Sequence, residues 1–367
     1  MFLDAISLTA FKNFEKLELS FQQGVHFILG LNGAGKTNLL DAIYYSCLTK
    51  SFFQTSDKSL IKHDHEFFRA VLHFKDVDKN HQLIIKCKPP GLKEFIWDDI
   101  LYEKVSNHIG KVPVVLIVPD DIYTFINDSE VRRRFLNQSL VQIDALYLEH
   151  LLIYNRILKQ RNALLKNSSI SVPKKRELMD IYDQRLVDSG TYIYKMRSHM
   201  IIEISRDLNG FVESISQHDQ QASLEYQSDA IGNYNELMNR SRERDLLSQR
   251  TNVGIHKDRI IPKLGERALR DFGSQGQIKT FIIALRLAQY RFLLNQSQQK
   301  PLLLLDDLFA KLDEERIKKL MQIIESLEIP QVFITDTDEK RAKRVIQYSQ
   351  IPHYFHYIYK GNVIDHE

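Results

Sequence analysis

The stretch GLNGAGKT, Gly30 to Thr37, decides the fold of this chain. It satisfies the pattern G-x-x-x-x-G-K-[ST], and it lies between the apolar run GVHFILG (24–30) and the amphipathic segment NLLDAIYYSCL (38–48). In this strand–loop–helix order, glycines let backbone N–H groups approach a phosphate closely, and the helix N-terminus adds positive potential. The stretch therefore predicts a phosphate-binding loop, a P-loop, in an α/β fold. A glycine turn without a ligand is the alternative.

The residues of this loop have different expected roles. Lys36 is expected to reach the β and γ phosphates of a nucleotide, and Thr37 is expected to give its hydroxyl to Mg²⁺. The other nucleotide contacts predicted within the loop and at the start of the helix are Gly30, Leu31, Asn32, Gly33, Ala34, Gly35 and Asn38.

A second segment, LLLLDDLFAKLD (302–313), is a buried strand that ends in two acids. Asp306 is expected to hold Mg²⁺ through water, and Asp307 to orient and polarise the attacking water, because phosphoryl transfer asks a protein mainly for positioning and charge stabilisation. Alone, the segment equally fits an ordinary strand followed by an acidic turn. Its combination with a P-loop favours the catalytic interpretation, with Lys36, Asp306 and Asp307 as the catalytic residues.

The two segments are far apart in the chain, which excludes a compact GTPase or small kinase and leaves an ATPase domain whose halves flank an insertion. We expect an N-terminal half at 1–127, a helical lobe at 128–217 and a C-terminal half at 218–367. Periodicity predicts strands at 16–21, 24–30, 112–119, 222–228, 259–264, 267–272, 301–305 and 331–335, hairpins at 69–87 and 353–364, and helices at 145–166, 174–208, 275–295, 313–327 and 338–348. No central helix is expected to exceed about 35 residues, or roughly 50 Å.

Composition sets further limits. The 367 residues are 43% hydrophobic, and no run approaches the ~18 apolar residues that a bilayer span needs, so we expect no membrane partner. The N-terminus does not resemble a signal peptide, and Cys47 and Cys87 form neither a metal-ligand pair nor a disulfide framework, which favours the cytoplasm. The net charge of +3 is small, but residues 128–210 hold 14 Lys and Arg against 10 Asp and Glu, a difference of +4.

Motifs along nearly the whole chain resemble those of the RecF family, within the ATP-binding-cassette ATPases of DNA repair. The similar segments are LTAFKNFEKLELSF, NGAGKTNLLDAIYYSCLTKSF, RRRFLNQSLVQIDALYLEHLLIYNRILKQRNALLK, GIHKDRI, DFGSQGQIKTFIIALRLAQ and LLLLDDLFAKLDEERIKKL. This chain departs from the family pattern at Lys12, where arginine is usual, at Asp41, where glutamate is usual, and at three positions of GIHKDRI, residues 254–260.

The resemblance implies a fold and a dimeric mechanism. It implies an α/β ATPase head of the ABC/SMC type, formed by the N- and C-terminal segments, with an inserted helical lobe. The signature SQGQ (Ser274, Gln275, Gly276 and Gln277) would close over ATP held by a second copy of the chain, and Asp313 would lie near that interface. Lys12, Asn13 and His63 would border the adenine and the α-phosphate. Asp307, shorter than the glutamate of transporters, implies slow hydrolysis, and Thr335 or Asp336 stands where transporters carry a histidine.

The resemblance also implies partners. These are single-stranded or gapped DNA, RecO and RecR, in gap repair with RecA loading and SOS induction. Basic residues that are candidates for phosphate contacts are Arg132, Arg133, Arg134, Lys159, Arg161, Lys174, Lys175 and Arg176, although each also fits a solvated helix face or a salt bridge. No nuclease carboxylate cluster stands out, so we expect a slow, DNA-dependent ATPase that does not cut DNA. The alternatives are an ATPase subunit of another assembly, such as a transporter, and a non-hydrolytic ATP-dependent clamp.

Overall fold

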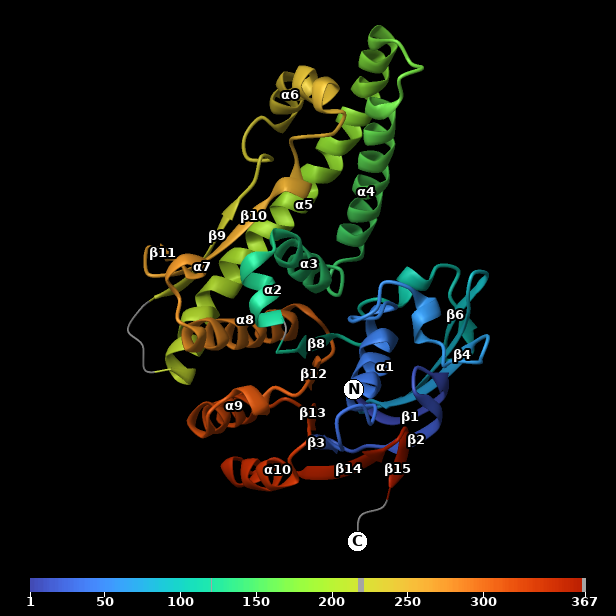
Figure 1. The fold of residues 1–367 in the computed structure, drawn as a ribbon, viewed down its shortest axis with the longest axis vertical. Coiled ribbons are helices and arrows are strands. Elements are labelled where there is room, and N and C mark those ends of the chain that lie inside the picture. Colours follow the sequence, from blue (N-terminus) through green and yellow to red (C-terminus); the bar gives the residue numbers. More distant parts are fainter. Residues whose placement is uncertain (120, 217–220, 365–367) are drawn as a thin grey trace. The chain divides into compact units, whose positions relative to one another are not determined.

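A computed structural model describes residues 1–119, 121–216 and 221–364, and the chain forms two compact units (Figure 1). The first unit consists of Met1–Ile122, Glu213–Gln217 and Ile282–Glu367. The second consists of Tyr123–Val212 and His218–Phe281, so it joins the central helices to a segment that follows them. The sequence-based division at 1–127, 128–217 and 218–367 stays a prediction.

The first unit contains a largely parallel sheet that carries the P-loop. Its strand order is β15-β14-β3-β13-β12-β8, with only β15 antiparallel to its neighbour. The strands are β3 (Gly24–Leu29), β8 (Val114–Ile117), β12 (Leu302–Leu305), β13 (Gln331–Asp336), β14 (His353–Tyr359) and β15 (Asn362–Ile364). Strands β3, β8, β12 and β13 are buried throughout, as expected for a parallel sheet covered on both faces. Because β3, β13 and β12 are neighbours, the segments that follow them meet at one edge.

A second sheet in this unit is antiparallel, in the order β2-β1-β4-β5-β6-β7. Its strands are β1 (Phe2–Phe11), β2 (Phe14–Ser20), β4 (Phe68–Lys75), β5 (Asn80–Lys88), β6 (Leu92–Trp97) and β7 (Ile100–Leu101). The predicted hairpin at 69–87 is confirmed as the pair β4 and β5. Buried residues of this sheet, such as Leu8 and Leu72, belong to one core with Leu304 and Phe333 of the parallel sheet.

Helices complete the first unit. α1 (Lys36–Leu48) follows the P-loop, and its residues Leu39, Leu40 and Ile43 are part of the same core. α9 (Glu314–Ser326) and α10 (Glu339–Val345) follow β12 and β13, and the side chains of Asp313 and Asp338 accept hydrogen bonds from the first turns of these helices. Cys47 and Cys87 are both buried and free.

The second unit is built on two helices that run side by side in opposite directions (Figure 1, green). These are α4 (Ala145–Lys166) and α5 (Val172–Ile215). The pairing is fixed near each end, where Tyr192 of α5 donates to Asp144 at 2.8 Å and Lys175 of α5 donates to the carbonyl oxygen of Leu165 at 2.9 Å. The other elements are α2 (Asp121–Asn127), α3 (Ser129–Leu140), β9 (Ala222–Gln227), α6 (Tyr234–Ser248), β10 (Arg259–Leu264), β11 (Arg267–Ala268), α7 (Leu269–Phe272) and the start of α8 (Gln275–Gln296).

Two sequence expectations were wrong. α5 has 44 residues, or about 66 Å, instead of at most 35, because buried apolar residues continue past 208 at Phe211, Val212 and Ile215. The segment 267–272 is not one strand, because only Arg267–Ala268 pairs with β10 and Leu269–Phe272 turns into a short helix. Within the described parts of the chain, none of the helices combines the length and the hydropathy of a bilayer span.

Candidate functional site

The predicted P-loop follows β3, and its last two residues, Lys36 and Thr37, form the start of α1, two residues before the helix expected from the sequence. Gly35 caps α1 with φ of 116°, and a Cβ at this position would lie 2.4 Å from Asn13 Nδ2 and 2.9 Å from Phe14 Cζ. Only glycine fits this combination of a left-handed backbone and a crowded neighbour. The free backbone N–H groups at the start of α1 and the helix dipole make this end of the helix a site for anions.

Lys36 is folded back over the loop that precedes it. Its side chain is 4% exposed, and Nζ donates to the carbonyl oxygens of Gly30 at 3.0 Å and Leu31 at 3.2 Å. Both acceptors belong to the turn where a phosphate chain is expected. The ammonium group is therefore held at the mouth of the loop by weak neutral partners, which a phosphate oxygen can replace.

The two halves of the predicted site meet at Thr37. Its hydroxyl donates to Asp306 at 2.9 Å from Oδ1 and 3.0 Å from Oδ2, although the two residues are 269 positions apart. Asp306 follows β12 and is almost fully buried. Burial raises the pKa of this carboxyl above its usual range, while hydrogen bonds from Thr335 and Thr37 and the charge of Lys36 act in the opposite direction. The hard oxygens of Thr37 and Asp306 suit Mg²⁺, which prefers one or two such protein ligands.

Thr335, at the end of β13, links the two acids. Its hydroxyl donates to Asp306 Oδ1 at 2.7 Å and accepts from the backbone N–H of Asp307 at 2.8 Å. Asp307 has φ of 44°, an unusual conformation for a residue other than glycine. Burial raises the pKa of the half-buried Asp307 carboxyl, and nearby Lys36 opposes this shift.

Asp336, the other residue that stands where transporters carry a histidine, is paired with an arginine outside the site. It is 1% exposed and accepts two hydrogen bonds from Arg341, at 2.8 Å from Nε to Oδ2 and 2.5 Å from Nη2 to Oδ1. A bidentate arginine pair of this kind is geometrically fixed. Thr335 is therefore the residue of this pair that contacts the acids of the site.

Asn13 and Lys12 support the loop and the helix behind it. Asn13 Nδ2 donates to the carbonyl oxygen of Ala34 at 2.9 Å, and its Oδ1 accepts from Asn38 at 2.7 Å. Lys12 Nζ lies 2.6 Å from Oδ2 of the fully buried Asp41. These contacts give both residues a structural role, and contact with a nucleotide stays a prediction for each. Lys12 and Asp41 are the two positions at which this chain departs from the arginine and the glutamate that the resemblance led us to expect, and in this structure they pair with each other.

The signature SQGQ lies in the second unit, at the N-terminus of α8. Ser274 and Gln277 form a capping box, because Gln277 N–H donates to Ser274 Oγ at 3.2 Å and Ser274 N–H donates to Gln277 Oε1 at 2.9 Å. Ser274 and Gln275 are exposed. This box is a local helix start that needs no second subunit, yet it leaves the hydroxyl hydrogen of Ser274 and the helix N-terminus available to an anion.

Most of the basic residues that the sequence suggests for DNA contacts form hydrogen bonds or ion pairs within the protein. Arg161 is fully buried between Asp183 at 2.6 Å and Asp245 at 2.8 Å. The other residues with protein partners are Arg132 with main-chain oxygens of Phe125 and Ile126, Arg134 with Glu130, Lys174 with Glu177, Lys175 with the oxygen of Leu165, and Arg176 with Glu243. Arg133 donates to a main-chain oxygen, and Lys159 is exposed.

Comparisons with known proteins place this chain among repair ATPases. A family model described as the RecF/RecN/SMC N terminal domain matches residues 2–354. The DNA replication and repair protein RecF of Cytophaga hutchinsonii is 39% identical over 349 residues, covering 95% of this chain and 92% of that protein. The protein of the same name from Phocaeicola vulgatus is 36% identical over 351 residues, covering 95% of this chain and 94% of that protein.

Solved structures agree. That of the recombination mediator protein RecF with ATP in the RecFOR pathway matches with a TM-score of 0.88 at 27% identity, over 99% of this chain and 97% of that chain. An SMC head bound to the C-winged helix domain of ScpA matches with a TM-score of 0.57 at 16% identity, over 99% of this chain and 98% of that chain, which shows a shared fold alone.

Proposed function

This chain belongs to the RecF family of DNA replication and repair proteins, and from that premise we propose that it is an ATP-dependent DNA-binding protein of recombinational gap repair. The ABC/SMC-type head predicted from the sequence is confirmed by the match to RecF structures. Family membership favours this role over the transporter subunit that the sequence left open. The observation that carries the proposal is the contact between Thr37 and Asp306, which joins the two halves of the ATP site.

The proposed ATP site uses the geometry of the first unit. The backbone N–H groups of Gly30–Gly35 and of the start of α1 would hold the phosphates, and Lys36 would exchange its contacts with the oxygens of Gly30 and Leu31 for phosphate oxygens. Mg²⁺, when bound, neutralises charge between the β and γ phosphates. Thr37 and Asp306 are the residues that would hold this ion, directly or through water, and their present hydrogen bond would then give way.

Asp307 is the proposed general base for hydrolysis. The backbone N–H of Asp307 donates a hydrogen bond to the Thr335 hydroxyl, which holds the backbone that carries the carboxylate. The raised pKa of this carboxyl makes it a better proton acceptor than an exposed aspartate. Its reach is one methylene shorter than that of glutamate, which supports a slow turnover. Slow hydrolysis suits a protein in which ATP mainly controls assembly.

Assembly is proposed to be an ATP-dependent homodimer. In this arrangement, the capped start of α8 at Ser274–Gln277 faces the γ-phosphate of ATP bound to a second copy. The support for this is chemical: Ser274 is exposed, its hydroxyl can still donate, and a helix N-terminus favours negative charge. Such a contact makes ATP a bridge between copies, so its binding stabilises the dimer by mass action.

The proposed DNA substrate is single-stranded or gapped DNA, with RecO and RecR as partners in RecA loading and the SOS response. The support is the high identity to RecF proteins and the match to a recombination mediator of the RecFOR pathway. The test is fluorescence anisotropy of a labelled gapped duplex with and without Mg-ATP. Salt-sensitive binding that ATP strengthens is expected, and binding that ignores both salt and nucleotide contradicts the proposal.

A further inference from the structure

A groove in the second unit carries an excess of positive charge. It encloses about 620 Å³ where the start of α3, the end of β9 and the segment from α6 to β10 meet. Five cationic side chains line it, and we call it the basic groove: Arg133, Arg244, Arg250, Lys257 and Arg259. Asp229 is the single carboxylate among the described residues of its lining, and its Oδ2 accepts a hydrogen bond from Gly254 N–H at 3.2 Å.

Most of these cations have no counter-charge in the protein. Arg244, Arg250, Lys257 and Arg259 are exposed, and none of the four forms an ion pair with any described residue. Exposed cations elsewhere in this unit do form such pairs: Lys174 with Glu177, Arg176 with Glu243, Arg206 with Glu203, and Arg240 with Glu236. Exposed cations without an ion pair also occur elsewhere in the described part of this unit, for example Arg156, Lys159 and Lys195. The basic groove differs from the rest of the surface because four such cations line one pocket.

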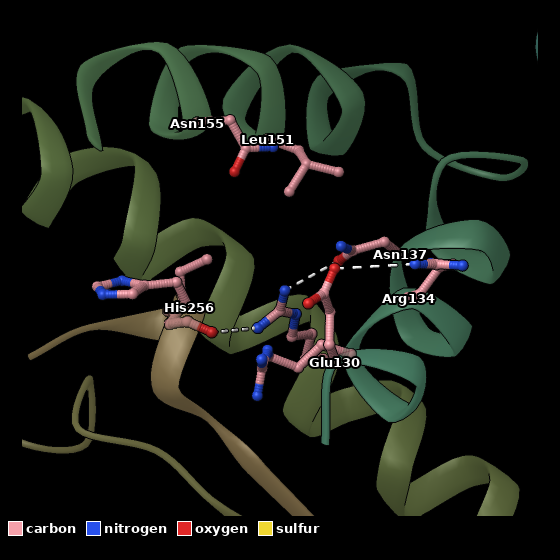
Figure 2. Close-up of a pocket in the computed structure, with 9 residues that line it drawn as sticks. Glu130, Arg134, Asn137, Leu151, Asn155 and His256 are labelled. Atoms are coloured by element: carbon pink, nitrogen blue, oxygen red, sulfur yellow. Dashed lines mark hydrogen bonds and ion pairs between the residues drawn. The ribbon is translucent and has the colours of Figure 1, made fainter. Parts of the chain in front are cut away.

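A neighbouring pocket shows the opposite arrangement. It encloses about 380 Å³ and shares Arg133 and His256 with the basic groove, but its other charges are paired. Figure 2 shows Glu130 beside Arg134, and their charged atoms lie 3.8 Å apart. Arg197, deeper in this pocket, lies 2.6 Å from Asp258. An anion therefore gains more in the basic groove, where no protein carboxylate has to be displaced.

The motif GIHKDRI fixes two of the cations in place. Lys257 and Arg259 are exposed while Asp258 and Ile260 are buried, so alternate residues from 257 to 260 face outward and inward. Asp258 is held from two sides, by Arg197 at 2.6 Å and by the hydroxyl of Tyr226 at 2.5 Å. These buried contacts hold the backbone that presents Lys257 and Arg259 to solvent.

Gly254 and His256 anchor the start of this motif. A Cβ at Gly254 would lie 2.4 Å from the hydroxyls of both Tyr154 and Tyr234, and φ is 130°. His256 Nδ1 lies 2.8 Å from the Tyr154 hydroxyl, and Nε2 lies 3.2 Å from the carbonyl oxygen of Thr251. Both ring nitrogens thus have partners within the fold. His256 therefore has a structural role in this loop, and the groups of the groove that can contact an anion are the arginines and Lys257.

We propose that the basic groove binds the phosphodiester backbone of DNA and is the surface through which the proposed DNA binding acts. This inference rests on the proposed function. The exposed lysine and arginine side chains come from three separate segments, which suits a row of phosphates along a strand better than one small anion. Such contacts bind without reading sequence, because they reach only the backbone.

The test compares two double variants that remove the same charge. Arg250→Gln with Arg259→Gln removes two cations of the basic groove, both exposed and unpaired, so the fold is expected to survive. Arg206→Gln with Arg240→Gln removes two exposed cations that pair with glutamates on their own helices. Affinity for a labelled gapped duplex is measured by anisotropy between 50 and 200 mM salt, beside ATP binding measured without DNA.

The groove variant is expected to lose roughly tenfold to a hundredfold in affinity at about 0.1 M salt, and the slope of log K against log salt is expected to fall by about 2. The control variant and the unmodified protein are expected to bind alike. Equal binding by the groove variant and the unmodified protein overturns the groove assignment but not the proposed function, and it would point to an acidic protein as occupant. No binding by the unmodified protein overturns both. ATP binding should not change in any variant.

Discussion

Thr37 and Asp306 are joined by a hydrogen bond of 2.9 Å, although they belong to opposite ends of the chain. The bond exists because β3 and β12 lie on either side of β13 in one parallel sheet, so the loops that follow them share an edge. Thr335, near the end of β13 between them, donates a hydrogen bond to Asp306 at 2.7 Å. The chemistry expected of the two motifs therefore depends on the packing of the whole first unit, and each of these residues can be tested separately.

Asp306→Asn should weaken metal binding without lowering the stability of the fold. The amide is similar in shape and can still accept hydrogen bonds from Thr37 and Thr335 at one oxygen, but it is a poor Mg²⁺ ligand. We expect ATP hydrolysis to fall by about a hundredfold or more, as for the loss of a major electrostatic contribution. Burial disfavours the charged carboxylate, so the thermal midpoint without nucleotide should stay level or rise. A loss of several degrees would contradict this account of Asp306.

Asp307→Asn should stop hydrolysis while leaving ATP binding intact. Removal of a general base typically costs 10² to 10⁴-fold in rate, so we expect a loss in about this range. The backbone bond from residue 307 to Thr335 does not involve the side chain and should persist. The measurement is single-turnover hydrolysis beside equilibrium binding of a fluorescent ATP analogue. Unchanged hydrolysis would remove Asp307 from the mechanism, and lost binding would make it a positioning residue of the nucleotide.

Arg161→Ala should destabilise the second unit strongly. Arg161 is fully buried and joins Asp183 of α5 to Asp245 of α6. Its removal leaves the buried Asp245 without a cationic partner, while Asp183 keeps Arg242 at 2.8 Å. Breaking a buried pair in this way costs about 3–5 kcal/mol. Arg240→Ala, which removes an exposed pair with Glu236, should cost about 1 kcal/mol or less. Urea unfolding monitored by circular dichroism compares the two, and equal midpoints would contradict the assigned role of Arg161.

Acid should weaken the fold through buried histidines. Burial lowers the pKa of His26, His108, His256 and His356 to about 4, whereas an unfolded histidine has a pKa near 6.5. The unfolded chain therefore binds more protons in this range, and the free energy of unfolding should fall as the pH drops from about 6.5 toward 4. Urea midpoints at a series of pH values measure the effect.

Urea midpoints of histidine variants, measured at the same series of pH values, identify the residues that cause the acid sensitivity. His26 Nδ1 and His356 Nε2 lie 2.9 Å apart in the parallel sheet. The double change His26→Gln with His356→Gln should reduce the pH dependence, which His108 and His256 still support, and His353→Gln, at an exposed position, should leave it unchanged. An equal slope in all three proteins would assign the acid sensitivity to other groups.

The strand–loop–helix arrangement of the P-loop segment could be predicted from the sequence because its motif is local. A P-loop needs a strand, glycines and a helix in immediate succession, and all three are visible between residues 24 and 48. The contact of Thr335 with Asp306 was less visible, since it depends on which strands are neighbours. Two signals pointed to Thr335: its place at the end of a predicted strand that follows the second motif, and its position, shared with Asp336, where transporters carry a histidine.

The surroundings of the DNA candidates could not be predicted from the sequence. A run such as Arg132–Arg134 looks like a basic patch, but its side chains turn to main-chain oxygens and to Glu130. The cations of the basic groove are spread from Arg133 to Arg259, and α6, which presents Arg244, was not predicted. Charge excess depends on which acids lie nearby in space, so it could be found only after folding. The cluster of basic residues from 240 to 259 was the one signal present in the sequence.

The role of Ser274 can be tested against a matched surface change. Ser274→Arg places a large cation at the start of α8, whereas Ser168→Arg places one in the exposed loop between α4 and α5. If Ser274 meets ATP of a second copy, the first change should abolish dimerisation and leave ATP binding to the single chain unaffected. The second change should alter neither property. Loss of dimerisation in both variants would show that the added positive charge, and not the position of Ser274, prevents dimerisation.

The central claim is that ATP at the P-loop joins two copies of this chain, and sedimentation velocity with Mg-ATP tests it most directly. The unmodified protein and Asp307→Asn should sediment as dimers with ATP and as a smaller species without it. Lys36→Ala should fail to form the ATP-dependent dimer, because it lacks the ammonium group that contacts the phosphates. A Lys36→Ala protein that still dimerises only when ATP is added would contradict the claim.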